Sequence, residues 1–505
     1  MKKIILSVIA TVATTGSLYA QYTPDALKFS QTNYGSTARF KAMGGAQIGV
    51  GGDMSSLGAN PAGLGLFTKS EFSLTPEFNI IKGNADYLNQ NTKTSKNQLN
   101  LNNVGAVFYS PTFKPKGQDA QKGLISAVFG VGYNRNNDFT ANLGANGTNK
   151  VNSIGDFFAE EANYFNRAPN NLPKGNIETM AYDNYVIGYD NTVPANGYYN
   201  ASRNNQNVLT NSNQQTQSEL RSGSTSEINV AGALNISNQV YIGASLGFVS
   251  TRYVNTKEFT ESGFNVDQNS KYDLSMRTNQ ETKGSGFNGR IGVIFRPISS
   301  FRVGATFQTP TWLFVDDNTS VVLDTRYPSG PNAGVFTNTP SQYPMTYRLR
   351  TPLKGSLGAS YVIANKAIIS ADVDYTDYSS MHFSIDQDNN QSVIDKQNAD
   401  IKKNYTEAVN YRIGAEYKVD NAFSLRAGYA NNGSPIKDDK KSYFATKMYS
   451  GGLGYRVGDY YIDATYQRVE SNTDIGAYTL NDFSEPVANI AVARNNVFLT
   501  FGVRF

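Results

Sequence analysis

The sequence predicts an all-β fold, namely a transmembrane antiparallel β-barrel of about 14 strands with an N-terminal plug, or hatch, inside the lumen. Three observations predict it. Apolar and polar residues alternate with a period of two in many segments, as in strands whose two faces meet different surroundings. The connections between these segments are alternately tight and long. Beyond the first twenty residues, no segment contains the roughly 20 continuous apolar residues of a membrane helix.

The composition of the 505-residue chain favours a β-protein and excludes several function classes. Gly (45), Tyr (32) and Phe (28) are abundant, whereas only 17% of the residues are charged. Aromatic residues favour strands. The absence of cysteine excludes disulfides and thiolate metal sites. The net charge of +4 is spread along the chain without a basic patch, so no nucleic-acid partner is expected.

The chain is expected to have three parts. Residues 1–20 carry Lys2 and Lys3 before an apolar run and end at Ala20, which predicts a secretory signal peptide. Residues 21–67 are expected to form the hatch, because residues 40–67 are rich in Gly and follow neither the helical nor the strand period. Irregular backbone of this kind would leave polar groups unpaired in lipid. Residues 68–505 are expected to form the barrel.

The tally of alternating segments supports the strand number. A slip of parity suggests a bulge near Asn102 and Asn103. The segments lie at 72–78, 99–109, 125–133, 228–236, 240–248, 287–295, 301–307, 347–361, 369–375, 411–417, 423–429, 449–455, 460–466 and 497–505.

The connections separate a membrane barrel from a soluble sandwich. Short turns at one end and long loops at the other are typical of membrane barrels, and only the connection 110–124 departs from this rule. Tight turns are expected at 237–239, 297–300, 364–366, 419–422 and 457–459. Long extracellular loops are expected at 134–223 (the largest), 255–284, 310–344, 377–404, 431–447 and 469–494.

The alternation also predicts which side chains face the lumen. The opposite register would place many charges in lipid, at roughly 2–4 kcal/mol for each Arg near the midplane. Expected inward charges are Arg290, Arg302, Arg348, Arg350, Arg412, Arg426, Arg504, Asp372, Asp374, Asp463 and Glu416. These charges either pair the wall with the hatch and solvate the lumen, or include one or two arginines near the hatch that receive a ligand carboxylate. Arg348, Arg350 and Arg426 are the candidates for the second role. Interfacial aromatic girdles are expected to include Tyr253, Tyr361, Tyr417 and Tyr466.

No catalytic residue, metal site or cofactor is predicted. The G-x-S-x-G match at 243–247 lies within a strand, whereas a nucleophile elbow needs a strand-to-helix turn. The expected role of its Gly and Ser residues is to make space in the lumen. His382 is the only histidine and falls in an expected loop, which leaves no basis for haem ligation. Residues 386–388 start like a calcium loop but lack its Gly and closing Glu.

Several motifs resemble the FadL/TodX family of outer-membrane transporters of hydrophobic compounds. The most specific is Asn60-Pro61-Ala62-Gly63-Leu64 within the Gly-rich N-terminal stretch. Weaker matches are FQTPTW at 307–312, DYTDYS at 374–379, and LRAGY at 425–429, which leads to a proline at position 435.

The resemblance implies a plugged fourteen-stranded barrel in the bacterial outer membrane, in contact with outer-membrane lipid. It implies uptake of long-chain fatty acids or other hydrophobic small molecules, which leave sideways through an opening at the third strand. It places Asn60, Pro61, Ala62 and Gly63 in the hatch, and we expect Gly130 and Gly132 at the opening. The long Asn-rich segment 134–223 departs from the family pattern.

Two other functions fit the same fold. Related barrels serve as shuttle or scaffold proteins in type IX secretion, where the extracellular loops would bind protein partners. A passive porin is the third alternative, although a hatch would obstruct its flow.

Overall fold

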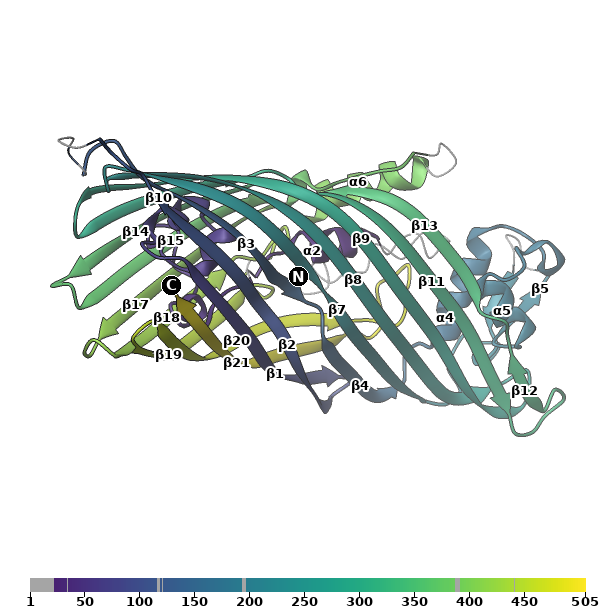
Figure 1. The fold of residues 1–505 in the computed structure, drawn as a ribbon. Coiled ribbons are helices and arrows are strands. Elements are labelled where there is room, and N and C mark those ends of the chain that lie inside the picture. Colours follow the sequence, from purple (N-terminus) through teal and green to yellow (C-terminus); the bar gives the residue numbers. More distant parts are fainter. Residues whose placement is uncertain are drawn as a thin grey trace.

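The computed structural model describes residues 22–33, 35–115, 119, 121–192, 197–386, 391–439 and 441–505, so the expected signal peptide lies outside the described residues. A single antiparallel sheet closes into a barrel where the last strand pairs with the first, from Glu71↔Arg504 to Asp86↔Asn489 (Figure 1). This pairing joins the first strand to the last, so the sheet is closed as a barrel in lipid requires. Within the described ranges, the helices are all too short or too polar to span a membrane.

The wall has fourteen strands when each interrupted strand is counted once, which confirms the predicted barrel. Each strand pairs antiparallel with its neighbours in the chain. In order they are β1 (Glu71–Tyr87), β2 (Gln90–Pro111), β3 (Leu124–Asp138) with β4 (Ala141–Asn149), β7 (Asn213–Ile236), β8 (Val240–Asn265), β9 (Ser270–Ile298), β10 (Phe301–Gln308) with β11 (Trp312–Tyr327), β13 (Ser341–Arg350) with β14 (Lys354–Ile363), β15 (Ala367–Asp377) with β16 (His382–Ser384), β17 (Glu407–Lys418), β18 (Phe423–Asn432), β19 (Thr446–Val457), β20 (Tyr460–Ile475) and β21 (Ala488–Arg504).

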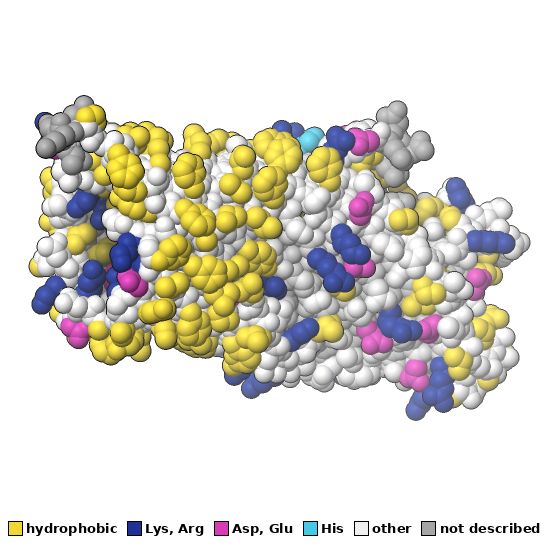
Figure 2. Space-filling model, in the orientation of Figure 1, with side chains coloured by type: hydrophobic (Ala, Val, Ile, Leu, Met, Phe, Trp, Pro, Cys, Tyr) yellow, Lys and Arg dark blue, Asp and Glu magenta, His cyan; other side chains and the backbone are white. Residues whose placement is uncertain are grey.

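The barrel has two zones that differ in which face of the wall, outer or inner, carries the apolar side chains. Near the short turns, outward side chains such as Leu246 and Phe248 are apolar and exposed. Figure 2 shows a band of hydrophobic side chains around this end of the barrel. Farther along β8, Tyr253 and Phe259 face inward and are buried. A lipid-embedded wall places apolar groups outside, whereas a wall in water buries them inside. The barrel therefore crosses the membrane with its turn end and extends its loop end into water.

Inward charges are buried in the membrane-spanning zone, as the alternation predicts. They include Arg290, Arg412, Asp372, Asp374, Asp463 and Glu416. The bulge near Asn102 is also confirmed, because the register with β1 shifts between Thr75 and Pro76. Tyr361, Tyr417 and Tyr466 face outward as expected, but the girdle position of Tyr253 is wrong. Odd-numbered residues of β8 face the lumen here, so Tyr253 lies on the inward face, whereas the even-numbered Phe248 lies on the outward face.

The predicted lumen positions of Arg348 and Arg350 are wrong. Both side chains lie on the outer face of β13, whereas Leu349 faces the lumen with only 1% of its surface exposed. The reason is a change of parity at 351–353, a break between β13 and β14 that the alternation does not reveal. The facing strand breaks at 309–311, and the Thr311 N–H donates to Thr351 Oγ1 at 2.8 Å across the two breaks.

Several expected loops are extensions of the strands. β8 and β9 continue through 255–284 and leave only a turn at 266–269, while β3, β4 and β7 occupy both ends of 134–223. Outward residues of these extensions are polar because they face water, so the membrane pattern ends there. The short turns lie where predicted.

A small extracellular lobe covers the loop end of the barrel (Figure 1). It contains α4 (Ile154–Tyr164), η4 (Pro169–Asn171), α5 (Ile177–Asp183), β5 (Ile187–Asp190) and β6 (Gly197–Asn200), and it shares one hydrophobic core with β8, β9 and β11. The other loop elements are β12 (Gly334–Thr337), η5 (Tyr378–Ser380) and α6 (Gln391–Asn404).

A buried carboxyl beneath the lobe is expected to make the docking of the lobe depend on pH. Burial raises the pKa of Glu261 to about 7, although Gln215 and Tyr272 donate hydrogen bonds to it at 2.6 and 2.7 Å. A carboxyl with a raised pKa favours the folded state when protonated, so its ionisation destabilises the docked lobe as pH rises from about 4.5 through 7, by about 3 kcal/mol. Amide hydrogen exchange of residues 150–212, corrected for intrinsic rates, is expected to be faster at about pH 8 than at about pH 5. Glu261→Gln is expected to remove most of this difference, and an unchanged difference would contradict the assignment.

The N-terminal residues lie inside the barrel. They form α2 (Tyr22–Ser30), α3 (Ala38–Ala42), η2 (Met54–Leu57) and η3 (Pro61–Leu66), and β1 begins directly after them. α3 packs against β18 to β21, while η2 and η3 pack against β2, β3 and β7 to β9. The lumen of the membrane zone is thus filled by this segment, which we call the hatch.

Candidate ligand-binding lumen and hatch

The Asn60-Pro61-Ala62-Gly63 segment is seated against the inner surface of the wall. Asn60 caps η3, because its Oδ1 accepts from the Ala62 N–H at 3.1 Å and its Nδ2 donates to the Ile48 carbonyl at 2.8 Å. A Cβ at Gly243 would overlap the Pro61 backbone, so only glycine permits this contact. The first Gly of the G-x-S-x-G match thus makes space for the hatch, and Ser245 faces the lumen as expected.

A buried chain of ion pairs ties α3 to the wall. Arg39 Nε donates to Glu416 Oε2 at 2.8 Å, and Arg426 Nε donates to the same oxygen at 2.6 Å. Arg426 also donates to Asp463 at 2.6 Å. Both of the carboxylates and the Arg426 side chain are at most 7% exposed. The Arg426 guanidinium is therefore engaged by two carboxylates next to the hatch, which matches the wall-to-hatch pairing considered from the sequence.

Gly130 and Gly132 face the lumen beside η2. A Cβ at Gly130 would lie 2.8 Å from Leu57, and one at Gly132 would lie 2.6 Å from the same side chain. β3 is paired here with β2 on one side and β7 on the other. In this conformation both glycines make space for Leu57.

Gly132→Val is expected to destabilise the seating of the hatch. The added atoms would overlap Leu57, and overpacking of this kind costs about 1–3 kcal/mol. Thermal unfolding in detergent and proteolysis of the hatch measure the effect. Leu57→Ala is expected to restore part of the loss in the double variant. Gly289→Val is the control, because its nearest neighbour would be 3.8 Å away. Equal effects at both glycines would refute the contact as the cause.

The wall has a break in its backbone ladder farther along the same strand. Pairing of β2 with β3 ends at Asn103↔Asn134, beyond which β2 pairs only with β1 and β4 pairs only with β7. β4 shares a core with β1, although β2 lies between these strands in the sheet, so β4 is displaced toward the lumen behind β2. The break begins near Leu99 and Leu101, at the outer edge of the apolar band, and Leu99 is 74% exposed.

Polar side chains bridge this break in place of backbone hydrogen bonds. Thr94 Oγ1 donates to the Asn142 carbonyl at 2.6 Å, and Asn142 Nδ2 donates to the Ser95 carbonyl at 3.3 Å. Asn100 donates to Asp138 at 3.0 Å. Isolated side-chain hydrogen bonds thus take the place of a continuous backbone ladder in this part of the wall.

A cavity of about 750 Å³ lies in the lumen between the hatch and the lobe. It is large enough for one small ligand. Its lining is mixed, with apolar side chains from α2, the wall and the lobe alongside charged groups. The apolar lining includes Leu27, Phe157, Phe259, Met276, Ile436 and Phe444.

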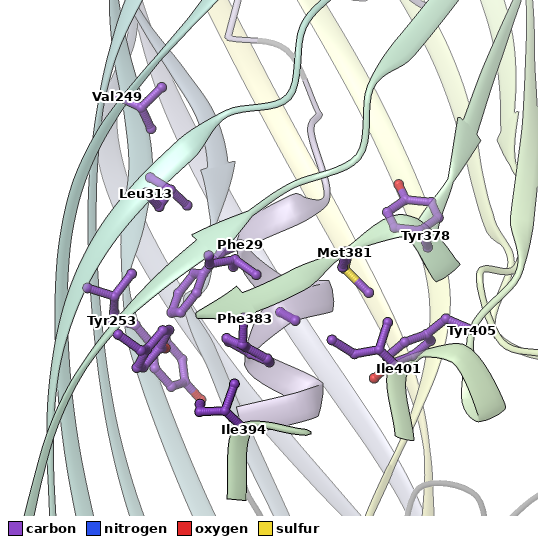
Figure 3. Close-up of a cluster of buried hydrophobic side chains, with 14 of the residues drawn as sticks. Phe29, Val249, Tyr253, Leu313, Tyr378, Met381, Phe383, Ile394, Ile401 and Tyr405 are labelled. Atoms are coloured by element: carbon purple, nitrogen blue, oxygen red, sulfur yellow. The ribbon is translucent and has the colours of Figure 1, made fainter. Parts of the chain in front are cut away.

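An aromatic cluster lies between α2 and the end of β3. Phe29, Phe139 and Tyr253 meet edge to face, with ring centroids 5.5 to 6.4 Å apart. Phe139 is in the short gap between β3 and β4, so this cluster connects α2 with the break in the wall. Figure 3 shows Phe29 and Tyr253 in this cluster, and Phe383 and Ile394 belong to the same group of buried side chains.

Three cations, Lys28, Arg221 and Lys257, line the cavity together with carboxylates. Lys28 lies 3.5 Å above the ring of Tyr253 and pairs with Asp25 at 2.5 Å. Arg221 donates to Glu219 at 2.8 Å. Burial disfavours the charged form of Glu219, but Arg221 and Lys257 outweigh it and hold the pKa of this carboxyl well below its ordinary value. Lys28 and Arg221 are thus charged groups of the cavity wall, each paired with a carboxylate.

The sequence could not identify these cavity residues. Glu219 and Arg221 lie in 134–223, where the outward and inward positions of β7 are both polar, so no strand pattern marks their side. Lys28 belongs to a segment without a motif. The structure brings together the hatch motif, Gly130, Gly132 and Arg426 around the hatch, whereas Arg348 and Arg350 are on the outer surface.

Comparison with known proteins agrees with this geometry. Residues 173–494 match the family model described as outer membrane protein transport protein (OMPP1/FadL/TodX). None of the curated proteins compared with the chain matches it.

Solved structures share the fold. The toluene transporter TodX of Pseudomonas putida is 13% identical with a TM-score of 0.53, and covers 93% of this chain and 98% of its own. A Pseudomonas aeruginosa FadL homologue is 11% identical with a TM-score of 0.52, over 94% and 98%. Because the family model matches most of its length, the chain belongs to the OMPP1/FadL/TodX family of outer membrane transport proteins.

Proposed function

We propose that this protein takes up hydrophobic small molecules across the outer membrane, with long-chain fatty acids or aromatic compounds as cargo. The observation that carries the proposal is a lumen cavity bounded on one side by the hatch. Tyr253 in its lining packs against Phe139, which lies in the gap between β3 and β4. An open aqueous pore offers little to such cargo. The transfer of a long acyl chain with some fifteen methylenes from water into an apolar pocket is favourable by about 12 kcal/mol.

The proposed route has three steps. Cargo is collected at the loop end and enters the cavity beside α2, where Leu27 and Phe259 provide apolar contacts. Lys28 or Arg221 receives a carboxylate when the cargo carries one. Cargo then leaves sideways where β2 and β4 are joined by side chains alone, after a shift of the hatch. The structurally similar TodX is a toluene transporter, which supports the aromatic alternative for this chain.

Uptake assays test the proposal. Cells that express the protein are expected to accumulate labelled oleate or labelled toluene faster than cells without it. Leu27→Glu is expected to abolish this gain, because it places a charge in the cavity, whereas Leu27→Met conserves apolar contact and is the control. Absence of uptake, together with co-purification of secreted proteins, would contradict transport and favour a secretion scaffold.

A further inference from the structure

The outer surface of β11 and β13 carries cations at the edge of the lipid-facing band. Trp312 and Phe314 face outward on β11, and across the strand pair they are opposite Arg350 and Arg348. The next outward residue toward the turn end is Leu353, which is exposed and apolar. The two arginines are therefore at the boundary where hydrocarbon gives way to headgroups.

The two guanidinium groups are accessible. Arg348 lies 5.2 Å from the ring of Phe314 and pairs with Asp386 at 2.6 Å, with 51% and 69% of the two side chains exposed. An exposed pair of this kind contributes little, so Asp386 is readily displaced. Arg350 makes no ion pair or side-chain hydrogen bond with any described residue. Arg350 pairs in the ladder with His382 of β16, and Lys402 of α6 adds another positive charge near this histidine.

A second pair of cations lies on the other side of Trp312 and Phe314. Arg252 on β8 and Lys283 on β9 are neighbours in the ladder and share one carboxylate, Glu281, at 3.1 Å each. Lys283 is two strands away from Arg348 across the sheet and two residues away along the strand direction. The two backbones are therefore roughly 12 Å apart at these residues. Cationic side chains thus flank an aromatic centre on both sides.

We propose that Arg348 and Arg350, with Trp312 and Phe314 beside them, bind the phosphate of a phosphorylated lipid in the outer leaflet. Guanidinium groups bind phosphate through two parallel hydrogen bonds, which a surface carboxylate such as Asp386 does not prevent. The aromatic side chains and Leu353 face hydrocarbon, so acyl chains attached to the phosphate contact them. A free phosphate ion would gain none of these apolar contacts, which is why a lipid is the occupant.

Native mass spectrometry of the detergent-solubilised protein tests this site. Bis-phosphorylated lipid A is the probe, and the same lipid after enzymatic removal of its phosphates is the matched ligand control. The Arg348→Gln, Arg350→Gln double variant is expected to bind the phosphorylated lipid about 30-fold more weakly, since each cation contributes about fivefold at an anionic lipid surface. The dephosphorylated lipid is expected to bind both proteins equally weakly.

Arg468→Gln is the matched protein control, because Arg468 on β20 is similarly exposed and pairs with Glu470 at 2.6 Å. It is expected to leave lipid binding unchanged. Equal loss in the control, or undiminished binding by the double variant, would overturn the proposal. Inorganic phosphate that competes at the affinity of the lipid would overturn the assignment to a lipid. Unchanged uptake of labelled cargo by the double variant is expected, which separates this site from transport through the lumen.

Discussion

Glu416→Ala is expected to release the hatch from the barrel wall. Glu416 is the carboxylate shared by Arg39 of α3 and Arg426 of β18, and it is 4% exposed. Its loss leaves the partly buried Arg39 with only the 4.0 Å contact to Asp53, while Arg426 keeps Asp463. Removing one partner from a buried ion pair costs about 3–5 kcal/mol, which is a large share of the free energy that holds a small segment in place.

Leakage through the barrel measures this release. Planar-bilayer conductance and the sensitivity of cells to bulky antibiotics are both expected to rise in the variant, because α3 and η2 no longer fill the lumen. Glu470→Ala is the control, since it breaks an exposed pair on the outer surface, where the expected effect is at most about 1 kcal/mol. A variant that stays as sealed and as stable as the unmodified protein would show that these ion pairs do not hold the hatch.

Locking the break between β2 and β4 is expected to stop uptake. The natural chain has no cysteine, so a Thr94→Cys, Asn142→Cys pair introduces the only thiols. Thr94 Oγ1 donates to the Asn142 carbonyl at 2.6 Å and Asn142 Nδ2 donates to the Ser95 carbonyl at 3.3 Å, so the two residues are in contact across the break. Transport of labelled cargo is expected to be lost after oxidation and restored by a reductant.

A second cysteine pair distinguishes closure of the break from general stiffening of the barrel. Ser110→Cys with Ala127→Cys joins β2 to β3 where the ladder is already continuous. Uptake is expected to be the same in its oxidised and reduced forms. If oxidation of the Thr94 and Asn142 pair leaves uptake unchanged, cargo does not leave at this break.

The strand number could be predicted from the sequence because each membrane crossing has one face in lipid and one in a polar lumen. That contrast disappears where the wall enters water. The outward face of β8 and β9 is polar through 255–284, so the membrane pattern did not predict that both strands continue there. The parity of a strand is predictable only as far as it is unbroken. The break at 351–353 reversed it, which moved Arg348 and Arg350 from the expected lumen to the outer surface.

The candidate site was predictable only where a local motif exists. Asn60 caps η3 through contacts within the hatch itself, and a short segment of sequence encodes this geometry. The hydrogen-bonded carboxylate of Arg39 is far away in the chain, since Glu416, which Arg426 also contacts, is brought to it only when the barrel closes. Lys28 and Phe139 likewise acquire their roles from α2 folding back against the wall.

The most direct test of transport through the lumen is the identification of what the purified protein carries. Lipid extraction and mass spectrometry of the protein are expected to reveal a hydrophobic small molecule in near-stoichiometric amount. Leu27→Glu is expected to lack this molecule, whereas Leu27→Met and the Arg348→Gln, Arg350→Gln double variant are expected to retain it. A protein that carries no such molecule, or that carries it equally when Leu27 is replaced by Glu, would contradict the account.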